Sequence, residues 1–218
     1  TQIGTDGEDD KASWNKVINP IGIDRTRQDE VITLRAGSYG GTMSWLLLDS
    51  KDEEHTDGQA ALAAVKLMEE HHPNKTGKPF FLAVGFYRPH TPYVAPLHHA
   101  RHYPLDKINP VLELPGDRDD IPPAALPDRP NQRELTIEQR KEIIRAYYAS
   151  LRLWMPASAA CSMAWKSLSS PMTPLSCSSA ITAITSATSV NVNAPSAPKR
   201  PERSSRGSVR RRGPHQFR

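Results

Sequence analysis

The clearest pattern of hydrophobic and polar positions is a short apolar run, residues 80–86, that passes directly into a proline-rich loop. The run contains aromatic and β-branched residues and has a basic residue next to a proline on either side, which predicts a strand buried on both faces. In open α/β sheets, ligand-binding groups gather just past the carboxyl ends of such strands. The pattern therefore makes Arg88 and His90, which follow the run, candidate binding residues.

The loop after this run has features of a rigid binding loop. Pro89 and Pro92 fix their own φ angles and bias Arg88 and Thr91 toward extended backbone, which would hold the imidazole of His90 in one place. A rigid loop that carries a cation and an imidazole suits an anionic substrate. The alternative is a structural loop whose histidine only caps the end of a strand.

Two helical patterns accompany the strand. Thr56 and Gln59 have the spacing of a capping box at the start of a helix that runs to about residue 70, and Thr136 and Gln139 have the same spacing. The apolar residues expected on the buried faces are Ala61, Leu62, Val65 and Met68 in the first helix, and Ile143, Ile144, Tyr147, Tyr148 and Leu151 in the second. A helix followed by a strand predicts an α/β fold.

The composition changes abruptly near Ser150. Residues 1–150 carry a net charge of −5 and residues 151–218 a net charge of +9, which gives the chain its net charge of +4. Fifteen serines lie at position 150 or later, against four before it. We therefore divide the chain into an α/β domain at residues 1–150 and a Ser/Arg/Pro-rich tail at residues 151–218. The tail is expected to be disordered or at most loosely helical, because it has little apolar surface to bury.

The central segment resembles the formylglycine-dependent sulfatases, in particular their iduronate-2-sulfatase-like members. The resemblance covers roughly residues 14–151, and the letters RPHTP at residues 88–92 are its most specific part. It continues through DEEHTDGQAALAAVKLMEE upstream and through YPLDKINP and EIIRAYYASL downstream. The resemblance implies part of an alkaline-phosphatase-like domain, in which helices flank a central, mostly parallel sheet.

The same resemblance implies a sulfuric ester hydrolase that acts on sulfated sugars or uronic acids. It implies that His90 contacts the sulfate ester and that Arg88 is a second substrate-binding residue. The substrate partner would be a sulfated carbohydrate, with no nucleic acid and no membrane span expected. The compartment would be the periplasm, the lysosome or the outside of the cell.

The chain lacks the residues from which the family forms or binds its cofactors. The family uses calcium and a formylglycine, which forms from the cysteine of a Cys-x-Pro/Ala-x-Arg motif. Cys161 is followed by Ser-Met-Ala-Trp and Cys177 by Ser-Ser-Ala-Ile, so neither cysteine fits. We therefore predict no catalytic residue and no metal ligand here, and a fragment that is inactive by itself.

A shifted reading frame accounts for the tail. With the frame moved back by one nucleotide, residues 180–189 permit the string SDHGYHLGDV, which is similar to the metal-binding Asp-His motif of sulfatases. The family's metal ligands then fall at Ile181 and Thr182, and neither side chain can bind a hard cation as a carboxylate does. The chain is therefore interpreted as an internal sulfatase fragment with a frameshifted tail.

Two other patterns leave alternatives open. Arg210, Arg211 and Arg212 could contact a polyanion by charge alone, so the alternative function is a non-catalytic scaffold with a basic polyanion-binding tail. His98, His99 and His102 include a His-x-x-His spacing that could bind zinc, although the sequence shows no third ligand.

Overall fold

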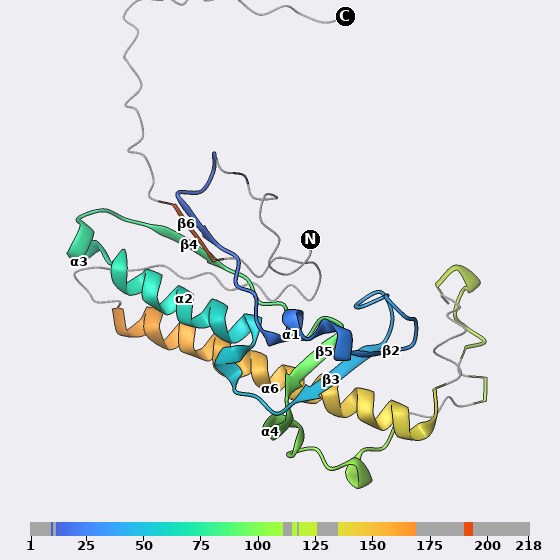
Figure 1. Ribbon diagram of the computed structural model, residues 1–218. Coiled ribbons are helices and arrows are strands. Elements are labelled where there is room, and N and C mark those ends of the chain that lie inside the picture. The colour runs from blue at the N-terminus through green and yellow to red at the C-terminus, as the bar shows by residue number, and fades with distance from the viewer. Residues whose placement is uncertain are drawn as a thin grey trace, which may run out of the picture.

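The computed structural model describes residues 10, 12–110, 115–116, 118–125, 135–168 and 190–193, which form a mixed α/β structure (Figure 1). One three-stranded sheet has the order β1-β6-β4, from Lys16–Ile18, Val190–Asn193 and Phe81–Val84. A second has the order β2-β3-β5, from Ile32–Thr33, Ser44–Leu48 and Tyr93–Pro96. The two long helices are α2, Thr56–Glu70, and α6, Ile137–Leu168.

Short helical segments connect these elements. They are α1 (Ile23–Thr26), η1 (Gln28–Glu30), η2 (Asp52–Glu54), α3 (Pro73–Thr76), α4 (Leu97–Ala100), η3 (Leu105–Lys107) and η4 (Pro123–Ala125). Across the described residues, none of the helices combines the length and the hydrophobicity that a membrane crossing would need.

The strand directions differ from the sequence-based prediction. Among the described strands only β3 and β5 pair in parallel, with Trp45 opposite Tyr93 and Leu48 opposite Pro96. The other three pairs, β1–β6, β4–β6 and β2–β3, are antiparallel. The α/β class is thus confirmed, but a central, mostly parallel sheet is wrong for these strands. The backbone groups of β4 need partners, and here an antiparallel segment from the tail supplies them.

The predicted strand at residues 80–86 is shorter and more exposed than expected. Strand β4 spans Phe81–Val84, and Phe81 is 56% exposed, so burial on both faces was wrong. Side chains alternate along a strand, and Leu82 and Val84 pack against the apolar cluster of α2 while Phe81 stacks on Trp14 at a ring distance of 5.9 Å. A helix therefore covers only one face of this small sheet.

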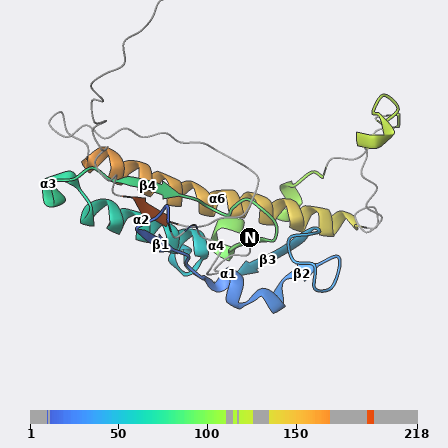
Figure 2. The same ribbon diagram turned by 90° about the horizontal axis from the view of Figure 1, so that it is seen from above.

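Helices α2 and α6 lie side by side along much of their length, as Figures 1 and 2 both show. The buried positions of both helices are rich in alanine. After the first turn of α2 they are Ala60, Ala61, Ala64, Leu67 and Met68, and in α6 they are Ile143, Ala146, Ala149, Ser150, Leu153 and Ala157. Small side chains let two helix backbones approach closely, so these faces are the natural contact surface.

This contact corrects the predicted buried faces. Ala61, Met68 and Ile143 are buried as expected, but Leu62 is 60% exposed and Tyr148 is 41% exposed. The helices turn their alanine faces inward, which rotates some of the larger apolar residues toward solvent. Apolar size alone was therefore a poor guide to the buried face.

The two predicted capping boxes had different outcomes. At the start of α6, the Thr136 amide donates to Gln139 Oε1 (3.0 Å) and the Gln139 amide donates to Thr136 Oγ1 (3.2 Å), so this box is confirmed. Helix α2 begins at Thr56 itself with His55 as its N-cap, and the Thr56 hydroxyl donates to Asp24 Oδ1 instead. The box at the start of α2 was therefore wrong.

Helix α6 crosses the predicted boundary between Ser150 and Leu151 without a break. The expectation of a disordered or loosely helical tail is wrong for residues 151–168, where Leu153 and Ala157 are buried. This segment is rich in alanine, the best helix former, and it docks beside α2. The rest of the predicted tail, except β6, lies outside the described residues, and the domain division itself stays a prediction.

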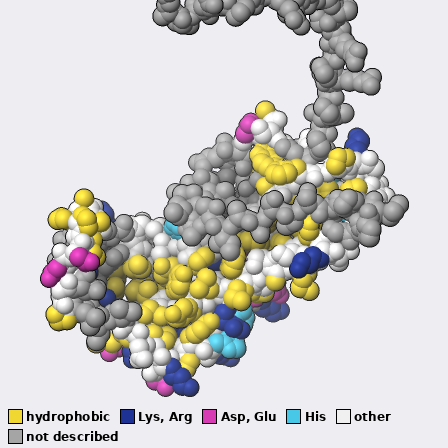
Figure 3. All heavy atoms as spheres, turned by 180° about the vertical axis from the view of Figure 1, so that it is seen from behind, with side chains coloured by type: hydrophobic (Ala, Val, Ile, Leu, Met, Phe, Trp, Pro, Cys, Tyr) yellow, Lys and Arg dark blue, Asp and Glu magenta, His cyan; other side chains and the backbone are white. Residues whose placement is uncertain are grey.

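Hydrophobic side chains also gather on the outside of the molecule. Figure 3 shows a broad apolar patch on one face. Several of the exposed apolar side chains belong to α6, namely Ile137, Tyr148, Met155 and Met163. Large contiguous apolar areas on a protein surface are usually covered by another part of a protein or by a partner.

The structure predicts opposite outcomes for two leucines of α2. Leu67 is 1% exposed in the main apolar cluster and Leu62 is 60% exposed on the same helix. Leu67→Ala should lower the free energy of unfolding by about 2 to 5 kcal/mol, because it removes buried methyl groups and leaves a cavity. Leu62→Ala should change it by less than about 0.5 kcal/mol. Equal effects of the two substitutions in denaturant titrations would contradict the orientation of α2.

Candidate functional site

The candidate binding loop connects β4 to β5. Within it, the His90 amide donates to the Tyr87 carbonyl (3.0 Å), and the Thr91 hydroxyl donates to the Gly40 carbonyl (2.9 Å). The peptide bonds before Pro89 and Pro92 are cis. The loop is therefore fixed both within itself and against the segment that precedes β3.

The side chain of Arg88 points into the protein. It is 1% exposed, and its Nη2 lies 2.9 Å from Asp24 Oδ2 in a buried ion pair. Its Nη1 donates to the carbonyls of Pro92 (2.5 Å) and His90 (3.2 Å). The described contacts thus give Arg88 the role of holding the loop in shape.

Asp57, the second residue of α2, holds the same loop from the other side. Its carboxylate accepts from the backbone amides of Tyr87 (2.7 Å) and Arg88 (2.8 Å). The carboxyl group is fully buried, and this burial raises its pKa to about 6, although Arg88 and the two amides act in the opposite direction. A buried carboxylate without these partners would be strongly unfavourable, so the loop and the start of α2 depend on each other.

Asp24 joins these groups into one network. Its Oδ1 accepts from the Thr56 amide (3.0 Å) and from the Thr56 hydroxyl (2.6 Å), while its Oδ2 faces Arg88. The Thr56 hydroxyl in turn accepts from the Gly22 amide (3.0 Å). A β-carbon on Gly22 would lie 2.2 Å from the Thr56 nitrogen, so this close approach needs glycine. We call Asp24, Thr56, Asp57 and Arg88 the arginine hub.

Sequence reasoning did not find the arginine hub. Its members come from α1, the start of α2 and the loop after β4, and 64 positions separate Asp24 from Arg88. One available signal was Asp57 in the first turn of a helix, where a carboxylate is favourable. That signal would not have identified the loop amides that Asp57 binds.

His90 is placed differently from Arg88. The imidazole is half-buried, its Nδ1 lies 2.6 Å from the Thr91 carbonyl oxygen, and its ring lies 5.3 Å from the ring of Tyr87. Since a carbonyl only accepts, Nδ1 carries the proton and the ring orientation is fixed. Among the described residues Nε2 has no hydrogen-bond partner. It can accept a hydrogen bond as the neutral ring and donate one as the imidazolium.

A buried histidine, His55, lies at the start of α2. Its Nε2 is 2.9 Å from the Ser50 hydroxyl, and its side chain is inaccessible to solvent. Burial, reinforced by the charge of Arg88 and opposed by that of Asp24, lowers the pKa of His55 to about 4. The ring is therefore neutral at physiological pH.

The structure keeps two of the three histidines of the possible zinc motif together and places the third elsewhere. His98 and His99 meet Asp52, with Nε2–Oδ1 distances of 3.2 and 2.8 Å. His102 is not part of this cluster and lies instead at the pocket described next. Asp52 is thus the third group that the sequence did not reveal.

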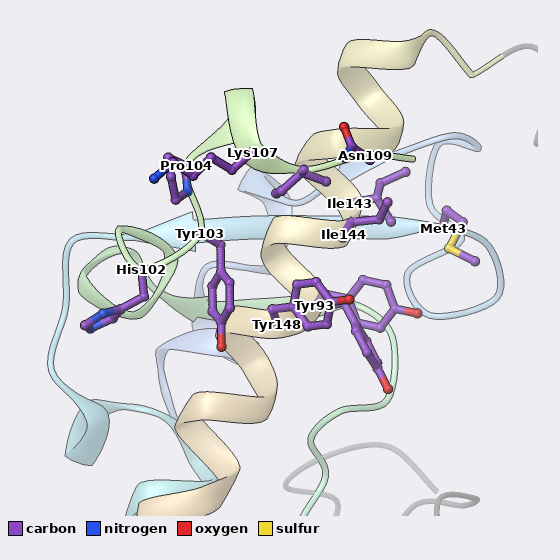
Figure 4. Close-up of a pocket in the computed structure, with 12 residues that line it drawn as sticks. Met43, Tyr93, His102, Tyr103, Pro104, Lys107, Asn109, Ile143, Ile144 and Tyr148 are labelled. Carbon is purple, nitrogen blue, oxygen red and sulfur yellow. The ribbon is translucent and has the colours of Figure 1, made fainter. Parts of the chain in front are cut away.

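A pocket of about 600 Å³ lies beside the first half of α6. Its walls are mostly apolar, and in Figure 4 the rings of Tyr93, Tyr103 and Tyr148 gather next to Ile143 and Ile144. Tyr93 meets Tyr147 edge to face at 5.3 Å, and Tyr103 meets Tyr148 at 5.1 Å. Such a surface suits an apolar or aromatic group better than a sulfate.

Cys161 has none of the features of a reactive cysteine. It lies on α6, where burial raises the pKa of its thiol to about 11, and its Sγ is 4.0 Å from the Ala61 carbonyl oxygen. A partly buried thiol that stays protonated, points at a backbone carbonyl and packs against the apolar cluster of α2 is a packing group. Cys177, Ile181 and Thr182 lie outside the described residues.

No protein-family model matches the chain. The chain is 34% identical over 122 residues to a sulfatase of Formosa agariphila, and this match covers 53% of the chain and 23% of that protein. It is 36% identical over 81 residues to human iduronate 2-sulfatase, covering 36% of the chain and 14% of that protein. The mouse iduronate 2-sulfatase is 36% identical over 69 residues, with 32% and 12% covered.

These comparisons confirm the resemblance inferred from the sequence. The chain has partial similarity to sulfuric ester hydrolases of the sulfatase class. Within that class, two of the similar proteins are iduronate 2-sulfatases. The matches span less than a quarter of the length of each of these relatives.

His55 gives a prediction about pH. A pKa lowered in the folded state stabilises the fold above the unfolded value of 6.5, and this contribution is lost as the pH falls toward 4. His55→Gln removes this titration. The excess free energy of unfolding of the wild type over the variant should therefore shrink, by up to roughly 1.4 kcal/mol per pH unit, as the pH falls through this window. Asp57, whose pKa is raised in the folded state, contributes stability that grows as the pH falls, and this contribution is the same in wild type and variant. Denaturant titrations at pH 4 to 7 measure the difference, and a constant difference would contradict the buried neutral ring.

Proposed function

We propose that this chain is a segment of a sulfuric ester hydrolase of the iduronate-2-sulfatase-like type, in which His90 contacts the sulfate group of a sulfated sugar or uronic acid. The partial similarity to sulfatases is the observation that carries the proposal. The geometry of the loop supports it, because the Nδ1 contact with Thr91 leaves the other ring nitrogen of His90 available to a ligand. The sulfated carbohydrate and an extracytoplasmic or lysosomal compartment follow from the same proposal.

In this proposal His90 and Arg88 have different tasks. As an imidazolium, His90 donates from Nε2 to a sulfate oxygen, where a charge-assisted hydrogen bond is strongest. Arg88 acts through the backbone, because its guanidinium holds the carbonyls of His90 and Pro92 and pairs with Asp24. The arginine hub thereby keeps the imidazole in position before substrate arrives.

The residues present do not fit the formylglycine or the calcium of the sulfatase class. Cys161 is a packing thiol on α6 and lacks the motif that precedes conversion to formylglycine. Ile181 and Thr182 stand where the shifted reading frame would place the family's metal ligands, and their side chains do not suit a hard cation. No step of the reaction is therefore assigned to either group in this chain.

The proposal includes a frame slip that accounts for the tail. The encoding nucleotide sequence tests it directly. An uninterrupted continuation of the sulfatase pattern in the shifted frame is the expected result. A maintained present frame would favour the alternative, a scaffold with a basic polyanion-binding tail.

Because no residue of this chain fits the formylglycine nucleophile or the calcium site of the sulfatase class, the chain as it stands should not hydrolyse a chromogenic aryl sulfate or a sulfated uronic acid. Removing a nucleophile or a metal costs far more rate than removing one hydrogen-bond donor. Release of sulfate or of the chromophore above the buffer rate, with purified chain, would show that this assignment of missing groups is wrong.

In a full-length protein with the upstream cysteine motif and the corrected frame, His90→Ala should lower kcat/KM by roughly a hundredfold, about 3 kcal/mol of transition-state stabilisation. His102→Ala, which removes an exposed histidine outside this loop, is the matched control and should retain the parent rate. The unfolding transition of both variants should stay at the parent value. An unchanged rate for His90→Ala would exclude His90 as the sulfate contact.

A further inference from the structure

A second cluster of side chains lies outside the arginine hub and the His90 loop. Asp52, His98 and His99 each offer one ligand atom, and these atoms all lie within 4.8 Å of one another. Among the described residues this is the only group of three or more histidine, cysteine or carboxylate side chains that meet in this way. No spacing along the chain connects Asp52 with the two histidines, which lie more than forty positions later.

The fold brings these residues together at one edge of a sheet. Strands β3 and β5 are parallel neighbours, and both end at the same edge, with Leu48 opposite Pro96. Asp52 begins η2 shortly after β3, and His98 and His99 belong to α4 directly after β5. The carboxyl edge of parallel strands is where α/β proteins gather ligand-binding groups.

The distances suit a small metal ion. Neighbouring ligand atoms of a tetrahedral zinc site lie roughly 3.3 to 3.6 Å apart when the metal–ligand bonds are about 2.0 to 2.2 Å. The Asp52 Oδ1 atom lies 3.2 Å from His98 Nε2 and 2.8 Å from His99 Nε2. Shifts of less than about 1 Å would therefore convert the observed hydrogen bonds into metal–ligand bonds.

The donor set selects the class of ion. Two imidazole nitrogens and one carboxylate oxygen suit zinc and the neighbouring divalent transition ions, whereas calcium and magnesium prefer oxygen ligands. The side chain of His99 is only 9% exposed, while those of Asp52 and His98 are 33% and 48% exposed. One ligand is thus held by packing, and the accessible side of the cluster leaves room for the ion to enter with bound water.

We propose that Asp52, His98 and His99 form a binding site for a zinc-class divalent transition ion, with a fourth coordination position open to solvent. The ion would join the segment after β3 to the start of α4, in place of the hydrogen bonds that connect them now. This site is independent of the proposed sulfatase function, because none of its residues belongs to the loop that carries His90.

The test uses the full chain freed of metal by dialysis against a chelator. Zinc is titrated against a chromogenic chelator that competes for it, and cobalt(II) is added separately to record its visible absorption. We expect one zinc ion per chain, tetrahedral cobalt absorption and a rise of the melting temperature with zinc. His98→Ala and Asp52→Asn should each weaken binding by roughly tenfold to a hundredfold or more.

His102→Ala is the matched control, because it removes an exposed neighbouring histidine that the cluster does not include. It should bind zinc as the wild type does. Circular dichroism confirms that each variant is folded, and His98 is exposed enough for its loss to leave the core intact. Absence of stoichiometric binding by the wild type, or equal binding by wild type, His98→Ala and Asp52→Asn, would overturn the proposal.

Discussion

The buried ion pair between Arg88 and Asp24 is the interaction on which the arrangement around the candidate loop depends. Taking two charges out of water is costly, and the cost is offset only when each charge keeps several well-placed partners. Here Arg88 also binds two loop carbonyls, and Asp24 also binds Thr56. The pair therefore fixes α1, the start of α2 and the loop after β4 relative to one another.

The hub also explains why the two candidate residues of the loop are placed differently. Arg88 is turned inward because its charge is needed to balance Asp24 and Asp57. His90 is left at the half-exposed side of the loop, with its orientation set by the Thr91 carbonyl. A loop held by buried charges can present an imidazole without the entropic cost of ordering it when a ligand binds.

The two proposed sites lie at the ends of different strands. His90 follows β4, whereas Asp52, His98 and His99 follow the parallel strands β3 and β5. The cluster of Asp52, His98 and His99 lies at the carboxyl edge of parallel strands, where α/β structures collect ligand-binding groups, whereas the loop of His90 follows an antiparallel strand. The broad apolar patch and the tyrosine-lined pocket are large apolar surfaces that no described residue covers (Figures 3 and 4).

The sequence by itself determined the local features, because these depend on neighbouring residues. They include the α/β class, the capping box of Thr136 and Gln139, a strand near residue 80, the loop with Arg88 and His90, and the resemblance to sulfatases. Tertiary structure decided what distant residues do to one another. Packing buried the alanine faces of α2 and α6 and paired β4 with β6. It also directed the side chain of Arg88 toward Asp24 and brought Asp52 next to His98 and His99. No periodicity or spacing encodes such contacts, since burial and charge balance arise only when the elements pack.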